Sequence, residues 1–229
     1  MDVGFIKHKG FLWGIDLSEE QAQQFNTYYN LIQQENKKYN LTRIEKEEDI
    51  LDEHFFDPLK GYLKGRDMTC SELLDVGSGA GFPGIPLKIF IPELRVILVE
   101  KTRKKALFLK KVVRELGLSR VEIWHNRAEQ IARSSSRETF CWVTARAVAP
   151  LPLILEIALP LLQKGGFFWS LQGPSYAESL AAAKSISSAC GARLEEVVQY
   201  SLPVTLKKRV ILIFKKTGES NSLYPRYKS

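Results

Sequence analysis

Apolar runs and stretches of helical periodicity alternate along most of this chain. Short runs rich in apolar residues predict strands near residues 72–76, 95–99, 120–124, 140–145 and 166–171. Apolar positions at helical spacing predict helices near residues 83–90, 102–116, 127–132, 151–162 and 174–189. Strands that alternate with helices in this way are typical of a parallel, doubly wound sheet, so we expect an α/β fold.

The two ends of the chain depart from this alternation. Residues 193–200 and 208–215 are apolar runs with no helix between them, which predicts a closing antiparallel hairpin and a seven-stranded sheet. Before the sheet, Ser18 and Gln21 form a capping-box pattern that opens a helix to about Lys38, and a second helix is expected over 46–63. We expect an N-terminal helical extension (1–66), a core (67–217) and a tail (218–229) in one compact domain.

The stretch between Leu73 and Gly84 carries the clearest chemical signal. Its apolar start predicts a buried strand, and four glycines follow within eight residues. Pro83 suits the first turn of a helix, where its missing N–H costs nothing. Glycines let the backbone approach a ligand closely, and a helix start offers free N–H groups. The segment therefore predicts a loop that holds a nucleotide-like cofactor.

Two cofactors fit this loop, and a plain strand-turn-helix corner is a third interpretation. A Gly-x-Gly-x-x-Gly pattern begins at Gly79 and matches the dinucleotide fingerprint, with Glu100 about 20 residues further on. The S-adenosylmethionine (AdoMet) loop, Asp-x-Gly-x-Gly-x-Gly, is matched by Asp75, Gly77, Gly79 and Gly81. There Glu100, at the end of the next strand, would accept from the ribose hydroxyls. Asp75 favours AdoMet, because a carboxylate repels pyrophosphate but not an α-amino group.

Composition excludes several classes of protein. The 229 residues are 45% hydrophobic, which suits a single buried core. Three cysteines without a CxxC pair are expected to be reduced thiols in a cytoplasmic protein, and three widely separated histidines predict no metal site. The longest apolar stretch, residues 149–162, is too short to cross a bilayer, and we expect no signal peptide and no membrane partner.

The segment LLDVGSGAGFPGIPLKIFIPELRVILVEKTRKKALFLKKV closely resembles the RsmG (GidB) family, the bacterial methyltransferases of 16S ribosomal RNA. Further blocks agree in order: Tyr39-Asn40-Leu41-Thr42, His54-Phe55-Phe56-Asp57, Asn126-Arg127-Ala128-Glu129, Ala145-Arg146-Ala147-Val148-Ala149 and Tyr224-Pro225-Arg226. The resemblance implies a class I AdoMet-dependent methyltransferase fold, which is Rossmann-like. It also implies methyl transfer to N7 of the guanine at position 527, in the 530 loop of bacterial 16S rRNA.

The resemblance further implies which residues contact AdoMet: Gly77, Phe82, Ala128, Glu129 and Arg146. We add Asp75, Gly79, Gly81 and Glu100 from the general logic of class I loops. Asn40, Thr42, His54 and Asp57 are interpreted as helix caps and packing contacts, with RNA contacts as the alternative. The chain departs from the family pattern at Pro58, Gln172 and Tyr227, which bears on RNA docking and not on the cofactor site.

The end of the fourth predicted strand limits the reaction. It carries Thr144-Ala145-Arg146-Ala147 and lacks the Asp/Asn-Pro-Pro-aromatic motif typical of exocyclic amine methylation. Cys141 lies at the start of that strand, where it cannot attack a pyrimidine carbon. A ring nitrogen such as guanine N7 has a free lone pair and needs no base. Arg146 is our candidate catalytic residue; it could also pair with Glu129 or another acid, or hold the AdoMet carboxylate or a target phosphate.

A basic segment follows Glu100, in a chain whose net charge is +7. Apolar residues at helical spacing occupy one face of the helix predicted over 102–116. The basic side chains are therefore expected to project outward from the other face. We name these residues the basic face and expect them to bind RNA: Lys104, Lys105, Lys110, Lys111 and Arg114. A solvated helix face is the alternative. The expected partner is 16S rRNA or a small-subunit particle, bound by a monomer.

Other functions stay open from the residues alone. A methyltransferase of another RNA or of a small molecule would use the same loop. A dinucleotide-binding oxidoreductase is disfavoured by Asp75 and by the predicted closing hairpin. A ribosome-associated binder without catalysis is disfavoured by the intact glycine loop.

Overall fold

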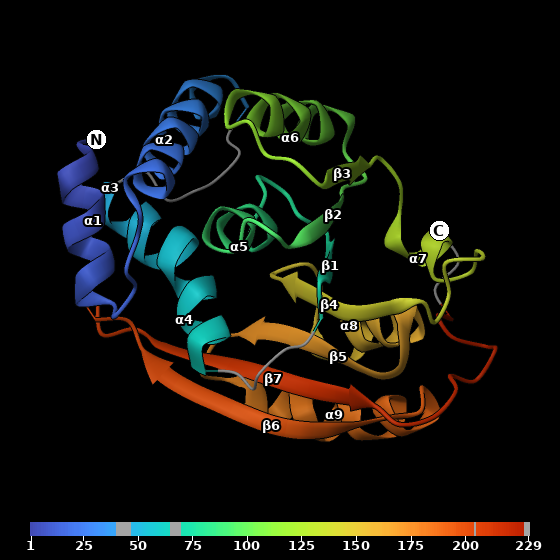
Figure 1. Ribbon diagram of the computed structural model, residues 1–229. Helices are drawn as coiled ribbons and strands as arrows, with labels where there is room; N and C mark the ends of the chain where they lie inside the picture. Colours follow the sequence, from blue (N-terminus) through green and yellow to red (C-terminus); the bar gives the residue numbers. More distant parts are fainter. Residues whose placement is uncertain (40–46, 65–69, 204, 227–229) are drawn as a thin grey trace.

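A seven-stranded sheet in the order β3-β2-β1-β4-β5-β7-β6 forms the centre of the computed structural model, which describes residues 1–39, 47–64, 70–203 and 205–226 (Figure 1). The strands are β1 (Glu72–Val76), β2 (Arg95–Val99), β3 (Val121–Trp124), β4 (Phe140–Arg146), β5 (Leu162–Gln172), β6 (Ala192–Ser201) and β7 (Lys208–Lys216). The first five run parallel, and β7 is antiparallel to both β5 and β6. The predicted α/β fold with its closing hairpin is confirmed.

Helices cover both faces of the sheet (Figure 1). One face carries α1 (Val3–Leu12), α2 (Glu19–Tyr39), α3 (Glu47–Ile50), the π-helix η1 (Leu51–Phe56), α4 (Asp57–Lys64), α5 (Gly84–Phe90) and α6 (Arg103–Glu115). The other face carries α7 (Ala128–Ile131), α8 (Leu151–Ala158), the 3-10 turn η2 (Leu159–Leu161) and α9 (Tyr176–Ala189). Each face encloses its own apolar core, as expected when both sides of a parallel sheet are buried.

The N-terminal extension differs from its prediction in two ways. Helix α1 was missed, because its apolar residues keep to no single face. The single helix expected over 46–63 is instead three consecutive elements, α3, η1 and α4, with a π-helix in the middle. The capping box at the start of α2 is confirmed: Ser18 Oγ accepts from the Gln21 backbone N–H at 3.1 Å, and Gln21 Oε1 accepts from the Ser18 N–H at 2.9 Å.

The extension shares a core with the sheet and is not a separate lobe. Phe25, Tyr28 and Phe55 are fully buried and pack ring against ring, with the Tyr28 and Phe55 centroids 5.1 Å apart. The Tyr28 hydroxyl donates to the backbone carbonyl of Ala80 at 2.6 Å. Ala80 lies in the glycine-rich turn after β1, so α2 supports that turn directly.

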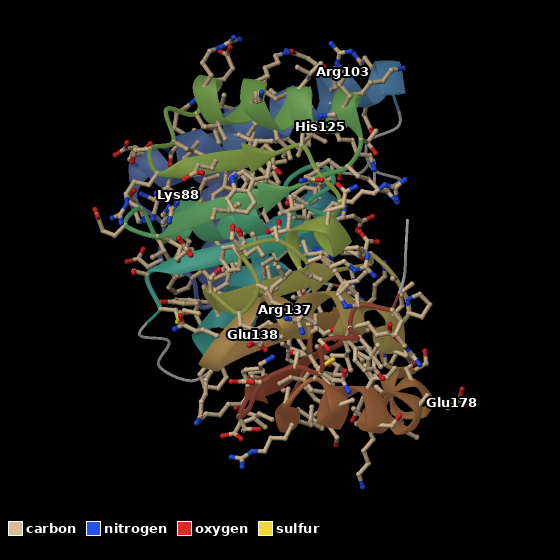
Figure 2. The ribbon with its side chains drawn as sticks, turned by 90° about the vertical axis from the view of Figure 1, so that its right-hand side faces the viewer. Lys88, Arg103, His125, Arg137, Glu138 and Glu178 are labelled. Atoms are coloured by element: carbon tan, nitrogen blue, oxygen red, sulfur yellow. A yellow bond between two sulfur atoms is a disulfide. The ribbon has the colours of Figure 1, made fainter. Side chains whose placement is uncertain are left out.

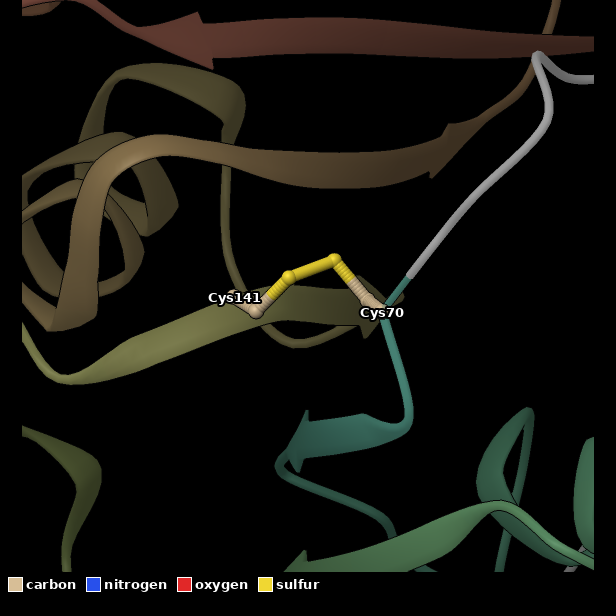
Figure 3. Close-up of a disulfide and its surroundings, with 2 residues drawn as sticks. All are labelled: Cys70 and Cys141. Atoms are coloured by element: carbon tan, nitrogen blue, oxygen red, sulfur yellow. A yellow bond between two sulfur atoms is a disulfide. The ribbon is translucent and has the colours of Figure 1, made fainter.

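A disulfide joins Cys70 to Cys141, and the expectation of three reduced thiols was wrong for this pair (Figure 3). Because β1 and β4 are parallel neighbours, with Leu73 opposite Trp142, the segment before β1 lies beside the first residues of β4. Cys70 precedes β1 by two residues, and Cys141 is the second residue of β4. Their Cα atoms are 5.9 Å apart, within the range a disulfide needs. Cys190 is a free, buried thiol, and burial raises its pKa to about 11.

The C-terminal segment docks on the core along much of its length. Arg137, which Figure 2 shows beside Glu138, donates to the backbone carbonyls of Ser220 and Tyr224. The Arg226 guanidinium binds the buried Glu156 of α8, with Nε 3.0 Å from Oε1. The expected tail is therefore a bound segment up to residue 226. Within the described ranges of the chain, no helix is long and apolar enough to cross a membrane.

We predict that Tyr28→Phe lowers the free energy of unfolding by roughly 0.5–1.5 kcal/mol, because the buried Ala80 carbonyl loses its donor. Tyr176→Phe is the matched control, since that hydroxyl accepts from the exposed Gln199 amide, at 2.8 Å. Equilibrium urea unfolding measures both changes. Equal stability of the two variants would show that the Tyr28 contact contributes nothing.

Candidate active site

A cavity of about 220 Å³ opens at the carboxyl ends of β1 to β4, where ligands of such sheets bind. We name it the loop cavity. It is lined by Val76, Gly77, Gly79, Val99, Glu100, Lys101, Thr102, Lys105, Asn126, Arg127, Ala128, Glu129, Ala147, Val148 and Ile157. Five of these lining residues were predicted from the sequence to contact the cofactor: Gly77, Gly79, Glu100, Ala128 and Glu129.

Gly77 occupies a position where a side chain would be both strained and crowded. Its φ is +69°, a left-handed conformation that side chains disfavour. A Cβ there would lie 2.7 Å from Cγ2 of Val148, which follows β4. The missing side chain thus lets the turn after β1 pass close to the segment after β4, and both line the cavity.

Glu100 holds two segments of backbone that line the loop cavity. Its carboxylate is 5% exposed, and Oε2 accepts from the Gly79 N–H at 3.0 Å. Oε1 accepts from the Thr102 N–H at 2.7 Å. A carboxylate has about four acceptor sites, so Glu100 can also accept from hydroxyl groups of a ligand.

Asp75 is placed differently from the prediction. It is fully buried and does not line the loop cavity; its Oδ2 accepts from the Gly84 N–H at 3.0 Å. Burial raises the pKa of this carboxyl to about 7, while the Gly84 N–H acts in the opposite direction. The predicted contact of Asp75 with a cofactor is not supported by this position, because the carboxyl instead ties the end of β1 to the start of α5.

Gly81 and Phe82 also lie outside the lining of the loop cavity. A Cβ on Gly81 would lie 2.6 Å from the Tyr28 hydroxyl, so this glycine allows the close packing of α2. Phe82 is 8% exposed and stacks on the His54 ring, with the centroids 4.3 Å apart. Burial, together with the nearby arginine charges, lowers the pKa of His54 to about 3. His54 is therefore a neutral packing residue, as interpreted from the sequence.

A second cavity of about 290 Å³ adjoins the loop cavity, and Ala147 lines both. We name it the arginine cavity. It is lined by Asp57, Arg146, Ala147, Ala149, Leu171, Gln172, Gly173 and Arg209. Ala147 has a φ of +53°, a strained conformation for a residue with a side chain, and such strain is concentrated at functional sites.

Arg146 lies in the arginine cavity and not in the loop cavity, so its expected contact with the cofactor carboxylate is not supported by its position. Its nearest acid is Asp57, with Nη2 3.8 Å from Oδ2, and not Glu129. Nη1 is buried and has no hydrogen-bond partner among the described residues. Burial lowers the pKa of the guanidinium, and the charge of Asp57 raises it.

Asp57 and Arg209 are the site residues that sequence reasoning missed. Asp57 comes from the extension, where it was taken as a cap or packing residue, and Arg209 comes from β7. Asp57 lies in the matching block His54-Phe55-Phe56-Asp57, whereas no local pattern marks Arg209, and the two residues meet only after the sheet has closed. Asn40, Thr42 and Tyr227 lie outside the described residues. Within the ranges that the structure covers, no three acidic, histidine or cysteine side chains are grouped to hold a metal.

The basic face mostly projects outward, as predicted. Ala106, Phe108, Leu109 and Val112 are buried, while Lys104, Lys110 and Arg114 are exposed and Lys111 is half-buried. Figure 2 shows Arg103, at the start of the same helix, on the upper edge of the molecule. Lys105 is the exception, because it lines the loop cavity. It was expected to face away from the glycine loop, and that expectation was wrong.

We predict that Gly77→Ala abolishes or severely weakens binding of AdoMet, because the added Cβ displaces Val148 into the loop cavity. Gly117→Ala is the matched control: its φ is +63°, yet nothing lies within 4 Å of an added Cβ. Isothermal titration calorimetry compares the two affinities. Similar binding by both variants would show that the close approach at Gly77 is irrelevant to the ligand.

Comparisons with known proteins agree with this arrangement. Residues 21–211 match the family GidB, described as rRNA small subunit methyltransferase G. A protein of Pelotomaculum thermopropionicum named "Ribosomal RNA small subunit methyltransferase G" is 42% identical over 96% of this chain and 93% of its own length. One of the same name from Staphylococcus epidermidis is 38% identical over 99% of this chain and 95% of its own length.

Solved structures with low sequence identity share the fold. TYW2 of M. jannaschii, solved in complex with AdoMet, superposes with a TM-score of 0.52 at 15% identity, over 63% of this chain and 68% of its own. A mutant of the 16S rRNA (adenine(1408)-N(1))-methyltransferase from Catenulisporales acidiphilia superposes with a TM-score of 0.55 at 13% identity. The match covers 72% of this chain and 92% of that protein's chain. The fold is that of the class I methyltransferases, and by the family match and its relatives the chain belongs to the GidB family, rRNA small subunit methyltransferase G.

Proposed function

We propose that this protein transfers a methyl group from AdoMet to N7 of the guanine at position 527 in the 530 loop of bacterial 16S rRNA. The observation that carries the proposal is the pair of adjoining cavities, one built on the glycine loop and one on Arg146, which meet at Ala147. The names of the relatives support the ribosomal substrate.

The loop cavity has the features that AdoMet needs. Glu100 would accept from the ribose hydroxyls, and Ala128 with Glu129 would flank the adenine. Gly77 and Gly79 leave room for the methionine end beside the backbone. When bound, AdoMet supplies an electrophilic methyl group on a sulfonium sulfur.

The methyl transfer requires no proton transfer by the protein. The N7 lone pair forms the new N–C bond while the C–S bond breaks and its electrons stay on sulfur, so the positive charge moves from sulfur to the purine. No proton leaves N7, and no general base is required. The task of the protein is to hold the two partners in line at Ala147, and such positioning can contribute roughly 7–11 kcal/mol.

The basic face supports an RNA partner. Helix α6 begins three residues after Glu100, so its exposed cations start at the rim of the loop cavity. Cations on one face neutralise successive phosphates and release counterions.

The direct test of the activity is mass mapping of methylated guanines. Small-subunit particles that lack the modification are incubated with the protein and AdoMet, and the 16S rRNA is digested and mapped. We expect one 7-methylguanosine, in the 530 loop. A product at another guanine, in another RNA, or none at all would overturn the proposal.

We predict that Glu100→Ala weakens AdoMet binding about ten- to a hundredfold, because a lost hydrogen bond to a charged acceptor costs about 1.5–3 kcal/mol. Glu93→Ala is the control, since that side chain is 91% exposed and remote from the lining. Calorimetry gives both affinities, and NAD should not bind the wild-type protein. Unchanged AdoMet affinity in the Glu100 variant would contradict its assigned role.

We predict that reversing Lys104, Lys110 and Lys111 to Glu flattens the slope of log RNA affinity against log salt by about two to three units, at roughly 0.7–0.9 per phosphate contact. Lys105 is left unchanged because it lines the loop cavity. AdoMet affinity should therefore stay at the wild-type value.

The control for this prediction reverses three exposed cations far from α6 along the sheet: Lys164, Lys184 and Arg193. Filter binding at several salt concentrations measures both slopes. If the two triple variants bind RNA equally well at about 0.15 M salt, where the Debye length is about 8 Å, the basic face is only a solvated helix surface.

A further inference from the structure

We propose that the C-terminal segment after β7 positions one wall of the loop cavity, and that the ion pair of Arg226 with Glu156 holds this segment in place. We name residues 217–226 the docked segment. The wall is formed by α7 and the adjoining part of α8, and it supplies three residues to the cavity lining: Ala128, Glu129 and Ile157. The inference rests on the proposed function, because it takes AdoMet as the occupant of the cavity. It adds positioning residues that do not touch the cofactor.

Helix α7 is too short to hold this wall alone. It has four residues, Ala128–Ile131, and a single helical turn has little stability of its own. Ala128 and Ile131 are buried in the same apolar core as Ile157 of α8, which fixes how deeply the helix lies. Its position along the cavity depends on what binds the turn that follows it, residues 132–138.

The docked segment binds this turn. Arg137 donates from Nη1 to the carbonyl of Tyr224 at 2.7 Å and from Nη2 to the carbonyl of Ser220 at 3.1 Å. Arg133 donates to the carbonyl of Pro225. Figure 1 shows the segment, in red, beyond the end of β7 on the side of the molecule where α7 and α8 lie. Because the acceptors are backbone carbonyls, the path of the segment determines where the turn is held.

The same segment binds α8 through Glu156. This carboxylate is 7% exposed, and all three of its printed donors belong to Arg226: the backbone N–H at 3.1 Å, Nε at 3.0 Å, and Nη2. The next residue of α8, Ile157, lines the loop cavity. One continuous stretch of chain therefore bridges the turn after α7 and the helix α8, which are the two parts of the wall.

The start of the docked segment is fixed independently of Arg226. Glu138 accepts from the Ser220 N–H at 2.7 Å, and it lies 2.9 Å from Nζ of the buried Lys216 at the end of β7. Figure 2 shows Glu138 beside Arg137. Loss of the Arg226 pair therefore frees the far end of the segment while the near end stays attached, so the wall is loosened and the fold is kept.

The effect on the cofactor is one of preorganisation. None of the described residues of the docked segment lines the loop cavity, so the segment reaches the cofactor only through the wall. A wall that is already in place has little freedom to lose when a ligand binds, and this strengthens binding without any new contact. The adenine is the part of AdoMet that we place against Ala128 and Glu129, so the docked segment acts on the adenine end.

Arg226→Ala tests the inference in the full-length protein. Calorimetry should show weaker binding of S-adenosylhomocysteine and of adenosine by the same factor, about tenfold, because both ligands carry the adenine and the wall must now be ordered when they bind. With ribosomal particles as substrate, the KM for AdoMet should rise by a similar factor, while kcat at saturating AdoMet stays within about twofold of wild type. A changed kcat with an unchanged KM would overturn the inference.

A second variant, Glu156→Gln/Arg226→Ala, separates positioning from stability. In Arg226→Ala the buried carboxylate loses its charged partner, which also lowers the free energy of unfolding. The Gln removes that buried charge, so urea unfolding should show that most of the stability returns. Affinity for S-adenosylhomocysteine should stay as low as in Arg226→Ala, because the segment still lacks its side-chain donors. Affinity that recovers together with stability would overturn the inference and leave the ion pair a structural contact.

Arg95→Ala is the matched control. Nη2 of Arg95 lies 2.7 Å from Oε1 of Glu122, and this ion pair is at the amino end of β2, on the opposite edge of the sheet from the loop cavity. Affinity for S-adenosylhomocysteine should stay at the wild-type value. Equal losses in the Arg95 and Arg226 variants would overturn the inference, as would wild-type affinity in Arg226→Ala. If the wild-type protein itself binds no S-adenosylhomocysteine, the proposed function fails, and not this assignment alone.

Discussion

Two buried carboxylates hold the glycine loop, and the rest of the site depends on them. Asp75 accepts the Gly84 N–H at 3.0 Å, and Glu100 accepts the Gly79 N–H at 3.0 Å. Together they tie the turn after β1 to the start of α5 and to the end of β2. Because the loop is fixed from both sides, its backbone can approach a ligand without rearranging, which lowers the entropic cost of binding.

The extension and the closing hairpin take part in the site and are not appendages. The extension supports the glycine turn through Tyr28 and supplies Asp57, while the hairpin supplies Tyr200 and Arg209. The two cavities thus differ in origin. The loop cavity belongs to the strand ends of the sheet, whereas the arginine cavity is assembled from three distant parts of the chain. The loop cavity therefore uses features that are general to the fold, whereas the arginine cavity depends on residues from the extension and the hairpin.

The sequence predicted those features of the fold and of the site that local sequence patterns determine. The sheet, the hairpin and the place of Glu100 beside the glycine loop followed from strand ends and glycine spacing, and the family resemblance implied the contribution of Ala128 to the same cavity. It did not predict where individual side chains point: Asp75 is turned inward, and Lys105 faces the loop cavity. Nor could it pair Cys70 with Cys141, 71 residues apart, or bring Asp57 to Arg209, since both depend on which strands become neighbours.

The division of labour between the two cavities is the central claim, and a crystal structure with S-adenosylhomocysteine bound tests it most directly. We predict electron density for the ligand in the loop cavity, with its ribose hydroxyls on Glu100 and its sulfur toward Ala147. Density for the ribose and adenine in the arginine cavity, away from Glu100, would contradict the claim.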